Sequence, residues 1–342
     1  MKRLILEGLT GRSEIRIGAD ARRLGDFAPI GRTLIVTDRK VYGLYRPLFR
    51  GWDALVLDRG EKTKTLAVVE RIQRELLRKG YDRGATLVGV GGGVICDLAG
   101  FAASIFMRGI RFGFVPTTLL AQVDASLGGK NGVNLDRYKN VIGVFRQPHF
   151  VLSDPRFLAT LPPTEILNGL AETVKAAAIR DRELFRDLET RAGQVLAGDP
   201  EVLGGMIERA AAVKIGIVAR DERERGARAL LNFGHTLGHA LEKTTAISHG
   251  AAVSVGMAAA ARLSTAEGLL PESEAERLIA LLNRLGLPTG MPTAWRRVLA
   301  AIEKDKKKDG RFIRFVMLRR IGSAVVRPIR LDALKEALHD LR

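Results

Sequence analysis

The segment ATLVGVGGGVICDLAGFAASIF, from Ala85 to Phe106, decides the fold class of this chain. Ala85–Val90 is short, apolar and rich in valine, as in a buried strand, and Val94–Phe106 has the length and composition of a helix. The glycines Gly91-Gly92-Gly93 join the two. A strand that runs through a glycine turn into a helix forms an anion site, because backbone N–H groups and the helix dipole point at the ligand. The spacing differs from GxGxxG, with Val94 at the third glycine position, so a tight turn without a ligand is the alternative.

Similar elements on both sides of this segment predict a parallel sheet. Gly31–Asp38, Asp53–Asp58 and Arg111–Pro116 are apolar runs typical of strands. Leu66–Lys79 carries apolar residues at helical spacing, with charges on the opposite face. This alternation of strands and helices predicts a doubly wound α/β domain.

The second half of the chain has a different character. After about Asp154 prolines punctuate the sequence, and long helical patterns then dominate as far as Lys304. Phe312–Leu318 and Ala324–Pro328 predict a hairpin, and Leu331–Leu341 predicts a closing helix. The expected fold class is therefore α/β plus α, with a doubly wound N-terminal domain and a mostly helical C-terminal domain.

Composition narrows the class of protein. The chain has 342 residues, of which 46% are hydrophobic and 6% aromatic, and a single cysteine, Cys96. One cysteine cannot form an internal disulfide and is compatible with a reducing compartment. The sequence contains no apolar run of transmembrane length and no apolar core of a signal peptide. We therefore expect a cytoplasmic enzyme without a membrane partner.

The formal charge of +17 indicates anionic partners. Nucleic acid is one class, but the basic residues are spread along the chain and aromatic residues for base stacking are few. Only Lys304–Arg311, KDKKKDGR, is a dense basic run. Anionic small-molecule substrates explain the charge equally well, so we expect a small-molecule substrate and no nucleic-acid partner.

Polar groups follow successive strands of the predicted sheet. They are Thr117, Thr118, Lys130, Lys139 and Asn140, the last two in an expected loop from Asn134 to Asn140. Open α/β sheets bind ligands at the carboxyl ends of their strands. The density of polar groups there favours a ligand site in the N-terminal domain.

Three of the five histidines lie in one window of the second half, Arg228–Met257. His235 and His239 are four residues apart, which places them on one face of a helix, and His249 precedes a second helix rich in small residues. Imidazole is a common zinc ligand, and three protein ligands leave a fourth position for substrate. With Glu172, these histidines predict a metal site; an HxxxH pair without a metal is the alternative.

Glu172 belongs to a helical pattern with a clear apolar face. Leu167, Leu170 and Val174 mark that face, and Lys175 stands three residues after Glu172. A surface ion pair between the two, worth about 0.3 kcal/mol, is the alternative to a functional carboxylate.

These motifs together resemble the 3-dehydroquinate synthase family, within the wider sugar-phosphate cyclases. The resemblance runs from about Gly60 to Gly322. The motifs that carry it are RGEKTK (Arg59–Lys64), GGGVICDLAGF (Gly91–Phe101), FMRGIRFGFVPTTLLAQVDASLGGKNGVN (Phe106–Asn134), KNVIGVF (Lys139–Phe145), GLAETVK (Gly169–Lys175), LNFGHTLGHALE (Leu231–Glu242) and HGAAVSVGM (His249–Met257).

The resemblance implies an NAD-binding domain over residues 1–160 and a helical metal- and substrate-binding domain over residues 161–342. It implies Zn²⁺ or Co²⁺ held by Glu172, His235 and His249, which leaves His239 for the substrate. The residues implied for NAD are Glu61, Lys64, Gly92, Gly93, Val94, Asp97, Thr117, Thr118, Lys130, Lys139, Phe157, Leu158 and Thr160. Those implied for the substrate are Asp124, Lys130, Asn140, Lys175, Lys214, Arg228, Asn232, His239 and Lys306, which is favoured over Lys307. Arg108 is expected to reach the substrate phosphate of a neighbouring subunit, which would make the protein a homodimer.

The implied substrate is a phosphorylated keto acid, 3-deoxy-D-arabino-heptulosonate 7-phosphate. The implied reaction runs through transient oxidation by NAD, phosphate elimination, reduction and intramolecular aldol closure to 3-dehydroquinate, a step of the shikimate pathway. Another sugar-phosphate cyclase, of the amino-dehydroquinate, 2-deoxy-scyllo-inosose or valiolone type, is the nearest alternative, and a metal-dependent polyol dehydrogenase is a more distant one. A neutral polyol has no need of Lys130, Lys214 and Arg228, so the density of cations favours the cyclases.

Two positions depart from the family pattern. Ala251 stands where family members usually have a glutamate two residues after the third histidine, so a partner of the metal site is lost or supplied elsewhere. Thr164 stands before Glu165, where an arginine is common.

Overall fold

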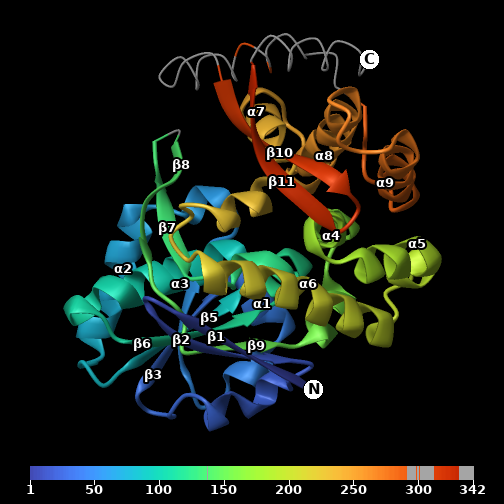
Figure 1. Ribbon diagram of the computed structural model, residues 1–342. Coiled ribbons are helices and arrows are strands. Elements are labelled where there is room, and N and C mark those ends of the chain that lie inside the picture. Colours follow the sequence, from blue (N-terminus) through green and yellow to red (C-terminus); the bar gives the residue numbers. More distant parts are fainter. Residues whose placement is uncertain (137, 291–297, 299, 301–311, 331–342) are drawn as a thin grey trace. The chain divides into compact units, whose positions relative to one another are not determined.

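A computed structural model describes the chain except for residues 137, 291–297, 299, 301–311 and 331–342 (Figure 1). The chain forms two compact units: unit 1 is Met1–Leu161 with Lys214–Arg223, and unit 2 is Pro162–Val213 with Glu224–Arg342. The predicted closing helix and the basic run, with Lys306, lie outside the described residues.

Unit 1 is built on a sheet whose described strands lie in the order β1-β2-β9-β6-β5-β3-β4 (Figure 1). These strands are β1 (Lys2–Gly8), β2 (Gly11–Ile17), β3 (Thr33–Asp38), β4 (Asp53–Leu57), β5 (Thr86–Gly91), β6 (Arg111–Pro116) and β9 (Phe150–Ser153). Neighbours pair in parallel except β1 and β2, which form an antiparallel hairpin at one edge. The predicted α/β class is confirmed.

Burial explains which strands the sequence predicts. β5 is buried along its whole length, and β3 is buried from Thr33 to Thr37, so both are continuous apolar runs. The edge hairpin β1–β2 has no counterpart among the predicted strands. In β2 only alternate residues, Ser13, Ile15 and Ile17, are buried, which leaves a weaker signal than a continuous run.

Helices connect the strands of unit 1. They are α1 (Arg39–Leu44), α2 (Leu66–Arg78) and α3 (Gly93–Ile105), with short helical turns η1 (Ala21–Asp26), η2 (Arg46–Phe49), η3 (Glu61–Thr63), η4 (Phe106–Arg108), the π-helix η5 (Ala121–Ala125) and η6 (Pro155–Thr160). α2 agrees with its prediction because Val69, Ile72 and Leu76 share its buried face and the hydroxyl of Thr65 accepts from Val68 N at its start. α3 packs on β5 and β6.

The expected loop from Asn134 to Asn140 is wrong, because most of it is strand. β7 (Lys130–Leu135) and β8 (Tyr138–Phe145) form an antiparallel hairpin, and among the described residues of this stretch Asp136 alone is a turn. Gly132 and Gly143 allow the two backbones to approach: a Cβ on Gly132 would lie 2.7 Å from the carbonyl oxygen of Ile142.

Unit 2 is mostly helical over its described residues. Its elements are α4 (Pro163–Arg180), α5 (Arg182–Leu196), α6 (Pro200–Arg220, which ends within unit 1), η7 (Ala227–Asn232), α7 (His235–Thr244), α8 (His249–Ala266), α9 (Glu272–Arg284) and the hairpin β10 (Phe312–Arg320) with β11 (Ser323–Arg330). The predicted terminal hairpin is confirmed. Among the described residues, no helix has both the length and the apolarity needed to cross a membrane.

The chain between Arg228 and His235 is not one continuous helix. It forms the turn η7, breaks at Gly234, where φ is +80°, and starts α7 at His235. A Cβ on Gly234 would lie 2.7 Å from the carbonyl oxygen of Val253 in α8, so the break depends on glycine.

Candidate functional site

Glu172, His235 and His249 come together in unit 2, each from a different helix. Nε2 of His249 lies 3.1 Å, and Nε2 of His235 lies 3.3 Å, from Oε1 of Glu172. One ligand atom from each of the three residues lies within 4.8 Å of the others. One carboxylate and two imidazoles suit zinc or cobalt and leave a coordination position for a substrate oxygen.

Close helix packing produces this cluster. A Cβ on Gly250 would lie 2.5 Å from Cα of Asn168, so α8 can start against α4 only without a side chain there. The amide of Asn168 fixes that contact, because its Oδ1 accepts from Gly250 N at 2.8 Å. Gly256 meets the backbone of Gly234 in the same way, which brings α7 against α8.

Glu172 is a buried charge with several partners, so the alternative of a surface ion pair is wrong. Its side chain and that of Lys175 are 1% and 4% exposed, and Lys175 Nζ pairs with Oε2 of Glu172. Burial alone would raise the pKa of Glu172, but the charges of Lys175 and His235 hold it well below the usual range. The carboxylate is therefore ionised and available to a cation.

Glu242 provides the partner that Ala251 does not supply. Its Oε1 lies 3.3 Å from Nδ1 of His249, the ring nitrogen that does not face Glu172. Burial disfavours a charged His249, yet its contacts with Glu172 and Glu242 raise its pKa to about 10. A carboxylate on Nδ1 orients the ring so that Nε2 faces Glu172, which is the usual arrangement for a histidine ligand.

His239 lies beside this cluster without joining it. Its ring centroid is 5.3 Å from that of His235, and the described metal-ligand group contains only Glu172, His235 and His249. Burial, and then the neighbouring His235, lower the pKa of His239 to about 4. It is therefore a neutral imidazole at pH 7, able to accept a proton or a hydrogen bond.

The remaining candidates of unit 2 have their own partners. Arg228 is 2% exposed in η7, so it is not a solvated surface charge. Asn232 donates from Nδ2 to Oε1 of Glu224 at 2.7 Å. Glu224 has a φ of +59°, a strained value for a non-glycine residue, and no sequence pattern singled it out.

The glycine turn of unit 1 lies directly at the N-terminus of α3, with Gly92 as the N-cap and Gly93 as the first helical residue. A Cβ on Gly92 would lie 3.1 Å from Thr118, and one on Gly93 would lie 3.1 Å from Ala125. The first turn of a helix presents N–H groups without intrahelical partners. The turn is thus bare backbone at a positive dipole end, which fits a pyrophosphate.

Lys64 links several candidate residues beside this turn. It is buried, forms an ion pair with Oδ2 of Asp97 in α3 and donates to Oδ1 of Asn140. Burial, opposed by Lys64, raises the pKa of Asp97 to about 6. Nδ2 of Asn134 donates to Oε1 of Glu61 at 2.7 Å, so Glu61 belongs to the same group.

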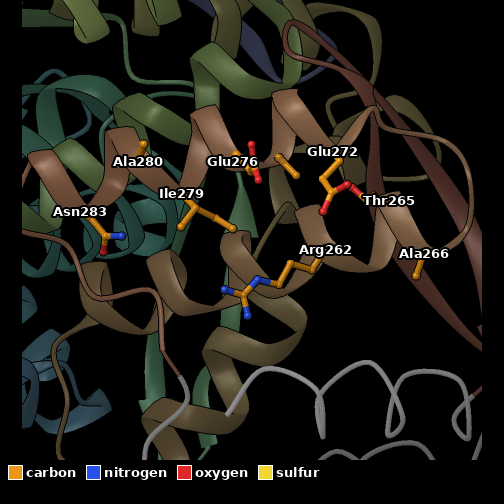
Figure 2. A pocket seen from close by; sticks show the side chains of 9 residues that line it. Arg262, Thr265, Ala266, Glu272, Glu276, Ile279, Ala280 and Asn283 are labelled. Atoms are coloured by element: carbon orange, nitrogen blue, oxygen red, sulfur yellow. The ribbon is translucent and has the colours of Figure 1, made fainter.

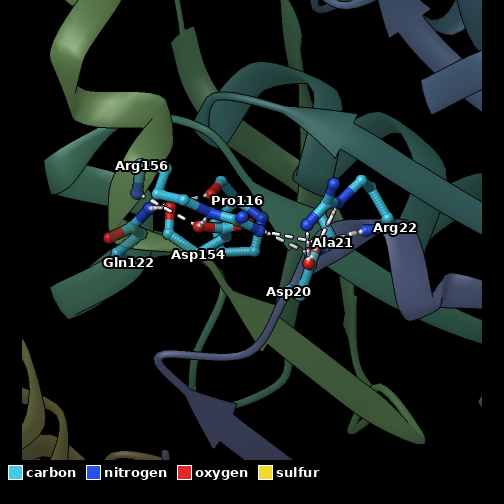
Figure 3. Close-up of polar contacts among 7 residues, drawn as sticks. All are labelled: Asp20, Ala21, Arg22, Pro116, Gln122, Asp154 and Arg156. Atoms are coloured by element: carbon cyan, nitrogen blue, oxygen red, sulfur yellow. Dashed lines mark hydrogen bonds and ion pairs between the residues drawn. The ribbon is translucent and has the colours of Figure 1, made fainter. Parts of the chain in front are cut away.

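A second polar network positions two other predicted segments (Figure 3). Nε2 of the buried Gln122 donates to the carbonyl oxygens of Pro116 at 3.1 Å and Asp154 at 2.9 Å. The carboxylate of Asp154 accepts from Ala21 N and from the guanidinium of Arg156. Thr117 and Thr118 follow Pro116, and Phe157, Leu158 and Thr160 follow Asp154, so Gln122 connects both segments.

Other candidates of unit 1 lie on several different elements. Lys214 Nζ contacts Asp124 through its Oδ1 at 2.9 Å and its carbonyl oxygen at 2.6 Å, so these two predicted residues meet. Thr160 shares a 2.6 Å hydrogen bond with the hydroxyl of Tyr45, a residue that sequence reasoning missed. Lys130 and Lys139 are exposed on the β7–β8 hairpin.

Arg108 is exposed in a strained turn after α3. Three consecutive residues have positive φ: Met107 at 47°, Arg108 at 70° and Gly109 at 120°. The guanidinium of Arg146 donates to the carbonyl oxygen of Ala103, and a Cβ on Gly109 would lie 2.8 Å from that guanidinium. A turn that holds an exposed arginine in strained backbone is a candidate for function.

One groove of unit 2 is lined by other residues. An open groove along α8 and α9 has Arg262, Glu272 and Glu276 among its lining (Figure 2). The groove residues include none of the predicted site residues.

Two family models match consecutive parts of the chain. The one described as 3-dehydroquinate synthase N-terminal matches residues 54–168, and the one described as 3-dehydroquinate synthase C-terminal matches residues 169–308. The 3-dehydroquinate synthase of Acidithiobacillus ferrooxidans is 44% identical over 317 residues, which is 88% of this chain and 86% of the relative.

Solved structures of other cyclases have the same fold. A 2-deoxy-scyllo-inosose synthase complexed with carbaglucose-6-phosphate, NAD⁺ and Co²⁺ has a TM-score of 0.88 at 25% identity and covers 100% of both chains. The 2-epi-5-epi-valiolone synthase of Streptomyces hygroscopicus subsp. jinggangensis, with NAD⁺ and Zn²⁺ bound, has a TM-score of 0.88 at 29% identity over 98% of each chain.

Proposed function

Because the chain belongs to the 3-dehydroquinate synthase family, we propose that it converts 3-deoxy-D-arabino-heptulosonate 7-phosphate to 3-dehydroquinate and phosphate. The observation that carries the proposal is the cluster of Glu172, His235 and His249. A buried carboxylate that two imidazoles approach through Nε2 is a site for a divalent cation, and the similar valiolone synthase was solved with Zn²⁺ bound.

The proposed reaction uses NAD and a divalent cation. The cation supplies a Lewis acid that lowers the pKa of a substrate alcohol, and NAD supplies a reversible hydride acceptor. Glu172, His235 and His249 hold the cation. The turn at Gly92-Gly93 and the ion pair of the buried Lys64 with Asp97 bind NAD.

The chain's own side chains account for the rest of the chemistry. Lys130, Lys214 and Arg228 bind the phosphate and the carboxylate of the substrate by charge-assisted hydrogen bonds, each worth about 1.5–3 kcal/mol. The neutral imidazole of His239 accepts a hydrogen bond from a hydroxyl of the bound substrate. Much of the catalysis is therefore orientation of the substrate and electrostatic stabilisation of its charged groups.

The test is phosphate release with NAD present in catalytic amount. We expect one phosphate per heptulosonate phosphate consumed, with many turnovers per NAD and no lasting absorbance of NADH. Accumulation of NADH in step with product would identify an ordinary dehydrogenase and refute the proposal.

A substrate panel separates this activity from that of the other cyclases. Sedoheptulose 7-phosphate and glucose 6-phosphate carry no carboxylate, so an enzyme with buried Arg228 should discriminate against both. Faster turnover of either sugar phosphate than of the heptulosonate phosphate would move the chain to another cyclase activity.

The proposed active form is a homodimer. Leu135, Tyr138 and Val141 are exposed apolar residues of the hairpin, and Met107 beside Arg108 is exposed as well. A second copy that covers these residues would bring Arg108 to the neighbouring site. Sedimentation should give a dimer, and Arg108→Ala mixed with a variant inactive at Lys130 should regain activity. A monomer of full activity would exclude a shared site.

A further inference from the structure

Asn134 occupies an irregular position in the β7–β8 hairpin. The pairing of the two strands shifts between Val133 and Leu135, so Asn134 leaves the regular ladder. It pairs instead with Thr65, and its N–H donates to the carbonyl oxygen of Lys64 at 2.9 Å. Such bulges redirect a side chain, often next to a functional site.

The redirected side chain joins two other segments. Nδ2 of Asn134 donates to Oε1 of Glu61 at 2.7 Å, and its Oδ1 accepts from Asn140 N at 2.8 Å. Asn140 has a φ of +55°, and its own side chain accepts from Lys64 Nζ. One amide therefore connects the Glu61–Lys64 turn with a strained residue of β8.

We propose that Asn134 is a positioning residue for NAD binding. Its side chain holds the carboxylate of Glu61 and the backbone of Asn140 in fixed positions relative to each other. The inference rests on the proposed function, because Lys64 belongs to the NAD site proposed there and the family resemblance implies Glu61 for NAD as well. It assigns Asn134 no contact with the reacting atoms.

The chemistry of the two side-chain contacts explains the choice of asparagine. Glu61 requires a donor and Asn140 N requires an acceptor, and a primary amide offers both from one short side chain. Aspartate has the same shape but only acceptors, so it would keep the contact with Asn140 N and repel Glu61. A charge-assisted hydrogen bond lost to Glu61 corresponds to about tenfold or more in affinity.

The experiment is a double-mutant cycle on NAD affinity, measured by calorimetry on the purified full chain. Asn134→Asp should weaken NAD binding at least about tenfold. In the double variant with Glu61→Gln, the new amide donates to the new carboxylate, so the pair is restored with reversed polarity. The double variant should bind NAD at least as tightly as Glu61→Gln alone. Asn283→Asp, the same substitution on exposed α9, should bind as wild type.

Each outcome decides the inference. If the fold-losses in NAD affinity of the two single variants multiply in the double variant, the inference is overturned and the proposed function is not affected. An Asn134→Asp protein with wild-type NAD affinity would have the same consequence. A wild-type protein that does not bind NAD would overturn both. A merely structural Asn134 would lower the melting temperature without changing the affinity of the folded protein. If Asn134→Asp does not fold, Asn134→Ala removes both side-chain contacts without adding charge and should show the same loss of affinity.

Discussion

Replacing Gln122 by leucine should destabilise unit 1 and weaken NAD binding. Gln122 is buried, and its Nε2 is the donor for the carbonyl oxygens of both Pro116 and Asp154 (Figure 3). Leucine has a similar volume but no donor, so both carbonyls lose this partner.

The magnitude follows from those two contacts. Removing one partner from a buried polar group costs about 1–3 kcal/mol, so two carbonyls give about 2–6 kcal/mol. The added apolar burial of leucine offsets part of this, which leaves about 3 kcal/mol. NAD affinity should fall several-fold, because Thr117 and Phe157 lie within three residues of the two carbonyls.

Urea unfolding is the assay. The sequence contains two tryptophans, Trp52 and Trp295, so a Trp295→Phe background leaves Trp52 in unit 1 as the only indole reporter. Gln73→Leu is the matched control: its Nε2 makes one hydrogen bond, to the carbonyl oxygen of Ala102 at 2.9 Å, away from the proposed site. It should cost about 1 kcal/mol and leave NAD affinity unchanged. A Gln122→Leu protein no less stable than this control, with wild-type NAD affinity, would refute the reasoning.

Further predictions concern unit 2. Glu172→Gln and His249→Ala should each be purified without the bound divalent metal, whereas His239→Asn should keep it; metal analysis that finds full occupancy in the first two would contradict the ligand set. Burial is the main cause that lowers the pKa of His239 from 6.5 to about 4 in the folded protein. The unfolded chain therefore binds the proton more tightly, so the free energy of unfolding decreases as the pH falls from 6.5 towards 4. His239→Asn should flatten that loss, and a ring ¹⁵N signal of His239 titrating near 6.5 in the metal-free protein would disprove it. Arg228→Ala should lower kcat/KM for the heptulosonate phosphate by about ten- to a hundredfold with metal content unchanged, and equal losses on substrates without a carboxylate would argue against a carboxylate contact.

Local sequence was enough for the elements whose signal is local. β5 could be predicted because burial on both faces gives a continuous apolar run, and α2 because its buried face gives apolar residues at helical spacing. The glycine turn could be predicted from its three consecutive glycines. The grouping of His235 and His249 with Glu172 was predicted from spacing and family motifs, and the structure brings the three together. The β1–β2 hairpin and β8 have no continuous apolar run, because many of their residues are exposed, so the sequence did not predict these strands.

Only the tertiary structure decided which polar side chains support the site. The sequence motifs contain Gln122, Asn134 and Glu242 but do not indicate a role for them. Each has its role through contacts with residues that come near only when the chain folds. The same holds for the burial of Lys175 beside Glu172. Spacing on a helix gives the distance between two side chains, but the neighbouring helices determine whether water reaches them. A sequence can therefore name the groups that carry the chemistry, while the fold sets their charge state and orientation through long-range packing.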